Sequence, residues 1–565
     1  MNNTSTRVIT AFLIASFVIG CGGNMSNNNE QFAEFEWFSY GGHDPVFEDS
    51  IDGHYINPII AGFFPDPSIV RVDEDYYMVH SSFSYFPGVP IFHSRDLVNW
   101  TQIGNVLDRP SQLNTGSIRI SRGIFAPAIR YHEGTFYMIT TMVDGGGNFF
   151  VTAEDPRGPW SDPIWLPEVD GIDPSMFFDE DGTIYIMNNG PPESEPLYDG
   201  HRALWIRTYD PQTQTTGPAT MIVDGGVDIS THPIWIEAPH IYKVDGRYIL
   251  IAAEGGTGPN HSEVVFRADH PMGPYEAYDK NPILTQRHLD PDRENPIAFT
   301  GHADFVETPD GDWWAVFLGV RPYRGNHFNT GRETFLLPVH WTEDGWPVIL
   351  TGDNTVPYHH PNPALEQDLP PEIPTTGNFT LLEEFDKDLG AHWIQIRTPH
   401  EIWHSIENGS LRLKTRPVSI GSLGQPSFMG RRQQHTNFEV STKLRFTPKK
   451  TGDRAGLVAF QNDDYYLFVG IQRFESESDS LIVEAKSGQT DSSYGTILTS
   501  VPLIGVSGPI FLKIEGQGEK YHFSYSWDGN DWLSITSNVD GSILSTENAG
   551  GFTGTVIGMY TSREK

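Results

Sequence analysis

Short apolar segments separated by acidic or glycine-containing turns run through most of the chain, and one such unit recurs five times. The copies begin at Phe64, Phe125, Ile172, Glu237 and His302. Each has a small or acidic residue, often followed by proline, then an apolar run, an Asp/Glu-Gly type turn and a second run rich in aromatic residues. Apolar runs that flank such a turn predict a β-hairpin. Because the unit repeats about every 50–65 residues, the sequence predicts a five-bladed β-propeller over residues 53–356.

A second pattern follows a proline-rich stretch. Residues 357–378 contain six prolines and lack apolar periodicity, which predicts a stiff linker. Beyond it, segments beginning at Ser410, Phe438, Tyr465 and Tyr521 alternate polar and apolar residues. This period of two predicts an antiparallel β-sandwich over residues 379–565. The expected fold class is therefore all-β, a five-bladed propeller followed by a sandwich.

The amino terminus has the pattern of an export signal. A basic residue, Arg7, precedes an apolar run from Val8 to Ile19 that is too short to span a membrane as a helix. Small and apolar residues lead to Cys21, the only cysteine, as in a bacterial lipoprotein signal. We expect residues 1–21 to be that signal, with Cys21 lipidated, and residues 22–52 to form a tether and lead-in to the propeller. The alternative is an ordinary secretory signal with an incidental cysteine.

Charge narrows the classes of partner. The 565 residues include 37 Lys plus Arg and 73 Asp plus Glu, for a net charge of −36. Such a charge repels nucleic acid and anionic membrane surfaces, and it suits a neutral ligand. The sequence therefore predicts membrane contact only through the lipid anchor of an exported protein. It leaves open which membrane face carries the anchor.

Three carboxylates, Asp66, Asp173 and Glu237, stand at matching places in three of the five units. Matching positions on successive blades converge on the propeller axis, so we expect the three side chains to meet. Several carboxylates in one pocket repel one another, which favours a chemical role over a structural one. Taken singly, each has a simpler explanation, as a residue that begins a strand or caps a turn.

The motifs around these residues resemble glycoside hydrolase family 43. They are FFPDPS at Phe63, GIDPSMFFD at Gly171, IEAPH at Ile236, TGHADFV at Thr300 and TGRETFLLPVHW at Thr330. The trailing sandwich is similar to the concanavalin-like jelly-roll domain of the β-xylosidase and α-L-arabinofuranosidase branch. The resemblance covers residues 53–565.

The resemblance implies an inverting exo-glycosidase that needs no cofactor. Asp66 would be the general base, Glu237 the general acid, and Asp173 would orient Glu237 and raise its pKa by repulsion. The expected reaction is removal of terminal β-1,4-linked D-xylose from xylo-oligosaccharides or arabinoxylan-derived chains, with α-L-arabinofuranosides as a further substrate class.

Four other residues acquire roles from the same resemblance. Arg332 would contact sugar hydroxyls, with a structural salt bridge as the alternative. Phe125 stands where relatives often carry tryptophan against the sugar. Phe552, from the sandwich, is expected to close the pocket, although either phenylalanine could simply be a core residue. His302 would lie near a cation, often calcium, which it would hold through water because calcium prefers oxygen ligands.

Two functional alternatives stay open at this point. The main activity could be that of an α-L-arabinofuranosidase, or the chain could be a non-catalytic glycan-binding surface lipoprotein. Retention of all three carboxylates argues against the second. A retaining fructan hydrolase is disfavoured because its E-C motif is absent, the sole cysteine being Cys21.

Overall fold

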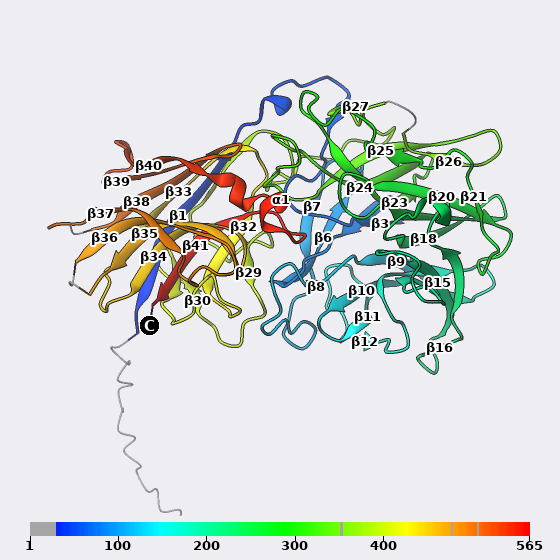
Figure 1. Ribbon diagram of the computed structural model, residues 1–565, viewed down its shortest axis with the longest axis horizontal. Coiled ribbons are helices and arrows are strands. Elements are labelled where there is room, and N and C mark those ends of the chain that lie inside the picture. The colour runs from blue at the N-terminus through cyan, green and yellow to red at the C-terminus, as the bar shows by residue number, and fades with distance from the viewer. Residues whose placement is uncertain (1–29, 351–353, 476–477, 506–507, 565) are drawn as a thin grey trace, which may run out of the picture.

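The computed structural model describes residues 30–350, 354–475, 478–505 and 508–564. They form two all-β bodies side by side, with the sandwich on the left and the propeller on the right of Figure 1. The expected signal peptide 1–21, its Cys21 and the first part of the tether lie outside the described residues. Within the described ranges, no helix has the length and apolar character needed to cross a membrane.

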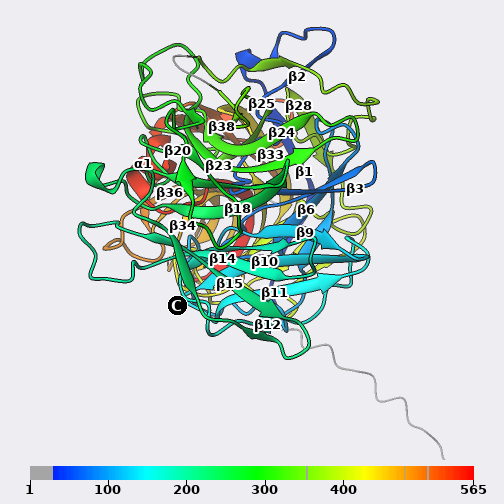
Figure 2. The same cartoon turned by 90° about the vertical axis from the view of Figure 1, so that its right-hand side faces the viewer.

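Five antiparallel sheets form the blades of the propeller, which confirms the predicted fold class. Figure 2 turns these sheets towards the viewer. The innermost strands, which contact one another from blade to blade, are β3 (Ser68–Val72), β9 (Ala128–His132), β13 (Ile172–Phe178), β18 (Glu237–Val244) and β23 (Ala298–Glu307). The second strands are β4 (Asp75–Val79), β10 (Thr135–Val143), β14 (Ile184–Gly190), β19 (Arg247–Glu254) and β24 (Trp313–Val320). The outer strands are β6 (Gly88–Ser94), β7 (Thr101–Leu107), β11 (Gly147–Ala153), β12 (Ile164–Trp165), β15 (Ala203–Asp210), β16 (Thr215–Thr216), β17 (Thr220–Asp224), β20 (Ser262–Ala268), β21 (Glu276–Ala277), β22 (Leu284–Thr285), β25 (Glu333–Trp341) and β26 (Pro347–Val348). The short strand β8 (Gly123–Ile124) pairs with β10 on the same edge as β9.

Each predicted hairpin is the inner pair of strands of one blade. In the fourth blade, Val244 pairs with Arg247 across a two-residue turn. Asp245 and Gly246 of this turn have φ angles of 49° and 77°. Positive φ at both central residues is what a tight type I′ hairpin requires, so turn chemistry sets the register here.

Two packed sheets form the sandwich. One contains, in spatial order, β30 (His404–Ile406), β31 (Leu411–Lys414), β1 (Phe32–Gly42), β33 (Asn437–Arg445), β38 (Ile510–Gln517), β39 (Lys520–Ser526) and β40 (Leu533–Asp540), with β28 (Phe379–Glu383) also paired to β1. The other contains β37 (Thr496–Pro502), β36 (Asp479–Ser487), β35 (Tyr465–Arg473), β34 (Asp453–Asn462), β41 (Val556–Arg563), β32 (Ser427–Arg432), β29 (Ile394–Ile396) and β5 (Tyr85–Phe86). The helices are single turns: η1 (Pro45–Phe47), η2 (Ile229–Thr231), η3 (Gly541–Leu544) and α1 (Thr546–Ala549).

Strand β1 corrects one predicted boundary. The prediction of a tether and lead-in over residues 22–52 is wrong for Phe32–Gly42, which is a central strand of the sandwich. Figure 1 shows this strand in blue among the orange and yellow strands of the carboxyl-terminal domain. Ala33 and Phe35 and, beyond a β-bulge, Phe38 and Tyr40 are buried in the sandwich core. Burial of one face provides the physical reason, because the period-two pattern of this segment needs a partner sheet.

The two bodies are joined at further places. Strand β5, from the first blade, pairs with β29 and extends a sandwich sheet. Strand β27 (His359–Pro361), within the predicted linker, pairs with β2 (His54–Ile56). Phe63 and Tyr85 also share an apolar cluster with sandwich residues such as Phe428. A single cut of the chain therefore cannot separate the propeller from the sandwich without exposing apolar surface.

Candidate active site

The backbone turns the three carboxylates towards the propeller axis at the start of the inner strands. Asp66 and Asp173 have φ angles of 55° and 52°, and Ala238, next to Glu237, has a φ of 52°. The strand register shifts around Asp173 and just beyond Glu237. Such bulges re-aim side chains, and aspartate tolerates the left-handed region better than most residues. Local strain at matching blade positions thus places the carboxyl groups.

One cavity of about 500 Å³ contains all the predicted site residues that the structure describes. They are Asp66, Phe125, Asp173, Glu237, His302, Arg332 and Phe552. Several other residues line the cavity although no sequence motif pointed to them, namely Phe83, Arg122, Ile234, Trp235 and the loop 255–260. Trp235 lies directly before the IEAPH motif, which could have signalled it, whereas Phe83 belongs to no recurring pattern.

Asp66 is held as a carboxylate. Ser81 donates a hydrogen bond to Oδ2 at 2.5 Å, and Arg332 donates from Nη1 to Oδ1 at 2.8 Å. Nδ1 of His302 lies 3.6 Å from Oδ1. Burial alone would raise the pKa of Asp66, but the charge of Arg332, the imidazole of His302 and the Ser81 hydrogen bond together bring it below its usual value. Asp66 is therefore ionised near neutral pH and can accept a proton.

Glu237 has the opposite character. Burial, and next the negative charge of Asp66, raise its pKa to about 8, while Arg332 and Arg202 offset part of the effect. Glu237 therefore keeps its proton near neutral pH and can donate it. Two carboxyl groups in one cavity thus differ in protonation because only Asp66 has an arginine hydrogen-bonded to it.

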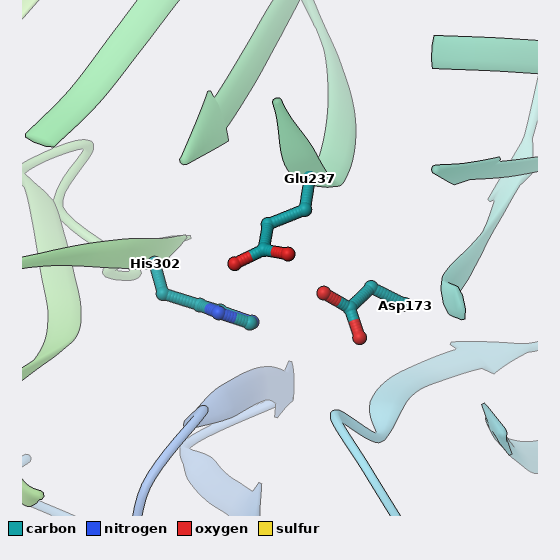
Figure 3. A group of neighbouring side chains, drawn as sticks. All are labelled: Asp173, Glu237 and His302. Carbon is teal, nitrogen blue, oxygen red and sulfur yellow. The ribbon is translucent and has the colours of Figure 1, made fainter. Parts of the chain in front are cut away.

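Asp173 is close to Glu237 and titrates with it. One ligand atom each from Asp173, Glu237 and His302 lie within 4.8 Å of one another, and Figure 3 shows the three side chains pointing together. Burial, then Glu237, then Asp66 raise the pKa of Asp173 well above its usual value. The sequence predicts that Asp173 raises the pKa of Glu237. Burial and Asp66 are the larger causes, because a protonated Asp173 carries little negative charge.

Arg332 pairs with the general-base candidate. The alternative role predicted for Arg332 is a structural salt bridge to Glu333 or another acid. Glu333 binds Arg321 at 2.7 Å, and the acid that Arg332 pairs with is Asp66, at 2.8 Å. Nη1 of Arg332 also donates to Thr257 at 3.2 Å. The guanidinium therefore faces the cavity, where it neutralises Asp66.

The sandwich supplies one wall of the cavity. The Phe552 ring meets Phe125 edge-on at 5.6 Å and lies nearly parallel to Phe83 at 6.3 Å. The guanidinium of Arg332 lies 5.5 Å from the Phe552 ring centre. Ser121 accepts a hydrogen bond from the Phe552 amide at 3.3 Å, which fixes the segment to the propeller. Both predicted phenylalanines thus line the cavity, so its closure depends on both domains.

The expected calcium finds no oxygen cage at this place. Asp173, Glu237 and His302 offer two carboxyl groups and one nitrogen, whereas calcium takes about six to eight oxygen ligands. The raised pKa values of the two carboxyl groups also oppose cation binding. These three residues do not fit a directly bound calcium, and a water-mediated ion near His302 stays a prediction.

Both domains match models of known protein families. Residues 55–347 match the family model for glycosyl hydrolases family 43. Residues 383–565 match the model for the beta xylosidase C-terminal concanavalin A-like domain. The chain is 41% identical over 522 residues to a xylosidase/arabinosidase of Butyrivibrio fibrisolvens, covering 90% of this chain and 95% of that protein.

Two further comparisons agree with these matches. The chain is 38% identical over 513 residues to a non-reducing end alpha-L-arabinofuranosidase of Bacteroides ovatus, covering 90% of this chain and 91% of that protein. It superposes with a TM-score of 0.87 on the crystal structure of a GH43_12 retrieved from capybara gut metagenome. That structure is 41% identical, and the match covers 94% of this chain and 99% of the other.

Proposed function

The chain belongs to glycosyl hydrolases family 43, and from this premise we propose that it is an inverting exo-glycosidase acting on terminal β-1,4-linked D-xylose in xylo-oligosaccharides. The observation that carries the proposal is the opposite protonation of two carboxyl groups in one cavity. Asp66 has a lowered pKa and Glu237 a raised one. A base and an acid on opposite sides of a glycosidic bond are what inverting hydrolysis requires.

In the proposed reaction, Asp66 takes a proton from a water molecule as that water attacks the anomeric carbon. The bond from this carbon to the leaving oxygen breaks, and Glu237 gives its proton to that oxygen. Asp173 orients Glu237, and Arg332 keeps Asp66 ionised before the reaction. Proton exchange with solvent then restores both carboxyl groups.

The size and lining of the cavity support exo action. Phe125 and Phe552 stand on one side, Trp235 and the loop 255–260 also line the space, and its volume of about 500 Å³ suits a small ligand. A closed pocket admits a chain end, whereas internal cleavage needs an open groove. With xylohexaose, xylose should appear from the earliest time while the chain shortens by single units. Early xylobiose and xylotriose without xylose would contradict exo action.

The names of two relatives favour a second candidate, α-L-arabinofuranosidase activity. One is a xylosidase/arabinosidase and the other a non-reducing end alpha-L-arabinofuranosidase. A side-by-side measurement of kcat/KM on aryl β-D-xyloside and aryl α-L-arabinofuranoside would rank the two activities. If neither aryl glycoside is hydrolysed, the alternative of a non-catalytic glycan-binding lipoprotein would be favoured.

Stereochemistry gives an independent test of the reaction type. Inversion predicts that a β-xyloside first releases α-xylose, which proton NMR detects before mutarotation. First formation of β-xylose would indicate a retaining mechanism, with Asp66 as nucleophile instead of base.

We also propose that the protein is exported and lipidated at Cys21, on the basis of the sequence alone. Metabolic labelling with a fatty acid should mark the wild type and leave Cys21→Ser unlabelled, with the variant released from the membrane fraction. Equal release of both proteins would favour an ordinary secretory signal.

A further inference from the structure

A second cavity, of about 240 Å³, lies where the propeller, the connecting segment and the sandwich meet. Phe64 and Gln102 line it from the first blade, residues 371–375 from the connecting segment, and Arg431 and Arg432 from strand β32. It shares no lining residue with the active-site cavity. Nothing in the proposed reaction uses it.

The two arginines are buried and have no carboxylate within salt-bridge distance among the described residues, although the charge of Glu383 acts on Arg431 from farther away. Arg431 is 2% exposed and Arg432 is 4% exposed. Nη2 of Arg431 donates to the side-chain oxygen of Gln434 at 2.5 Å. Three buried guanidinium nitrogens have no hydrogen-bond partner among the described residues: Nε and Nη1 of Arg431 and Nε of Arg432. Neither guanidinium forms an ion pair with a described residue. Buried charges in proteins are normally paired, so this arrangement calls for an explanation.

Aromatic rings cover the faces of both guanidinium groups. Arg431 lies 4.6 Å from the centre of the Tyr40 ring, and Arg432 lies 4.6 Å and 4.3 Å from the centres of Phe63 and Phe64. Such stacking stabilises a cation through its faces. The N–H donors of a guanidinium lie in its plane, so their need for acceptors is left unmet.

The end of a strand explains how consecutive residues reach one cavity. Strand β29 pairs with β32 only at Met429 and Gly430. Arg431 and Arg432 run past this pairing, and their side chains leave the strand on opposite faces. Both side chains nevertheless line the same cavity, which lies beyond the end of β29. Residues Gly390–His392 form part of its wall.

The chemistry of the lining is one-sided. His392 also has a buried nitrogen, Nε2, without a partner, so every buried side-chain atom of the described lining that lacks a hydrogen-bond partner is a nitrogen. Burial lowers the pKa of Arg431 to about 10 and that of Arg432 to about 9, and both remain protonated at neutral pH. Glu372 is the one carboxylate in the lining, and it is exposed. The site therefore lacks a buried acceptor with negative charge.

We propose that this cavity binds a small oxyanion, such as inorganic phosphate, sulfate or a sugar carboxylate, through the N–H edges of Arg431 and Arg432. The planar donor fork of arginine matches two oxygens of such an anion. The bound anion ties the first blade, the connecting segment and the sandwich together. Because Phe64 lies two residues before Asp66, the anion also orders the segment behind the general base.

Titration of the full-length protein tests the proposal. Inorganic phosphate, sulfate and glucuronate are each added at constant ionic strength set by sodium chloride, with binding followed by calorimetry and the Tm by differential scanning. An inorganic oxyanion or a sugar carboxylate should raise the Tm along a saturating curve that matches the binding isotherm. Comparison of the three anions identifies which source the site prefers.

Single-arginine substitutions test whether the anion binds in this cavity. Arg432→Gln should weaken it by about tenfold to a hundredfold, as expected for loss of charged hydrogen bonds. Arg412→Gln is the matched control, because Arg412 is an arginine of the same domain already paired with Glu34 and Glu407, and it should bind as the wild type does.

If Arg432→Gln does not fold, Arg432→Lys replaces it, since lysine keeps the charge without the fork and should show an intermediate loss. Absence of saturable binding to the wild type, or unchanged affinity in the Arg432 variant that folds, would overturn the proposal.

Discussion

Two sets of carboxyl groups lie on the inner strands of the propeller, and they hold protons very differently. Asp304, on β23, is fully buried and accepts hydrogen bonds from Ser68 at 2.6 Å and Arg130 at 3.0 Å. Burial would raise the pKa of Asp304, but Arg130 and the hydrogen bonds outweigh it and lower the pKa to about 2. In the active-site cavity, the pKa values of Asp173 and Glu237 are raised instead.

The hydrogen-bond and ion-pair partners of these carboxyl groups, and not how deeply the groups are buried, account for the difference between their pKa values. Asp304 also accepts from Tyr242 and from the Ile69 amide, so one carboxylate links strands β3, β9, β18 and β23. That network leaves no acceptor capacity for a ligand. Asp173 and Glu237 lie close to each other in a cavity, where a substrate can supply the missing partners. The comparison separates a carboxylate that links four inner strands from the carboxyl groups for which we propose a chemical role.

The largest expected effect tests the catalytic set. Asp66→Ala should lower kcat/KM by about 10⁴-fold on both aryl xylosides and xylobiose, because every substrate needs the activated water. The Tm should also fall, because Arg332 loses its buried partner, so kcat/KM is compared at a temperature where both proteins are folded. Asp310→Ala, at an exposed hairpin tip, is the control and should be as active as the wild type. Near-normal activity of the Asp66 variant would remove it from the role of base.

Substitution of Asp304, the carboxylate that links the inner strands, should lower the stability of the protein. Asp304→Asn leaves the Arg130 charge buried without its partner, and we expect a loss of about 3–5 kcal/mol in the free energy of unfolding. Urea denaturation of the variant and of Asp310→Asn measures the difference. A stable Asp304 variant would show that the inner network contributes little, and the contrast between the two sets would fail.

Glu237→Ala should divide substrates by their leaving groups. Xylobiose needs a proton on its leaving oxygen, so its hydrolysis should fall by about 10²–10³-fold. An aryl xyloside with an activated leaving group needs less help and should lose far less. Equal losses on the two substrates would exclude Glu237 as the general acid.

The pH profile sharpens the assignment further. Glu237 has a pKa of about 8 and must be protonated, so kcat/KM should fall about tenfold per pH unit above that value. The acid limb should lie below the usual range of an aspartate, because the pKa of Asp66 is lowered. An alkaline limb that persists unchanged in Glu237→Gln would assign it to another group.

The last expected effect is on the pH dependence of stability. The pKa of Glu237 is raised on folding from 4.5 to about 8, so the native state binds the proton more tightly. The associated stability is present below pH 4.5 and is lost as the pH rises to about 8, at about 1.4 kcal/mol per pH unit for the one proton involved. Glu237→Gln should therefore gain stability relative to the wild type across this window. Parallel curves in thermal denaturation would contradict the raised pKa.

Local sequence determined the five hairpins and much of the site. Turns such as Asp245-Gly246 and the alternation of apolar residues act over a few residues, and they were sufficient to predict the blades and most sandwich strands. Because matching blade positions converge, the meeting of Asp66, Asp173 and Glu237 in one cavity also followed from the repeat.

Only the tertiary structure decided the remaining features. Phe32–Gly42 alternates as a strand does, but its partners in the sandwich lie hundreds of residues away. The unpaired state of Arg431 and Arg432, and the split between the pKa values of Asp66 and Glu237, likewise depend on what surrounds each side chain. Propensity and turn chemistry act between neighbours in the chain, whereas burial and electrostatic pairing act between neighbours in space.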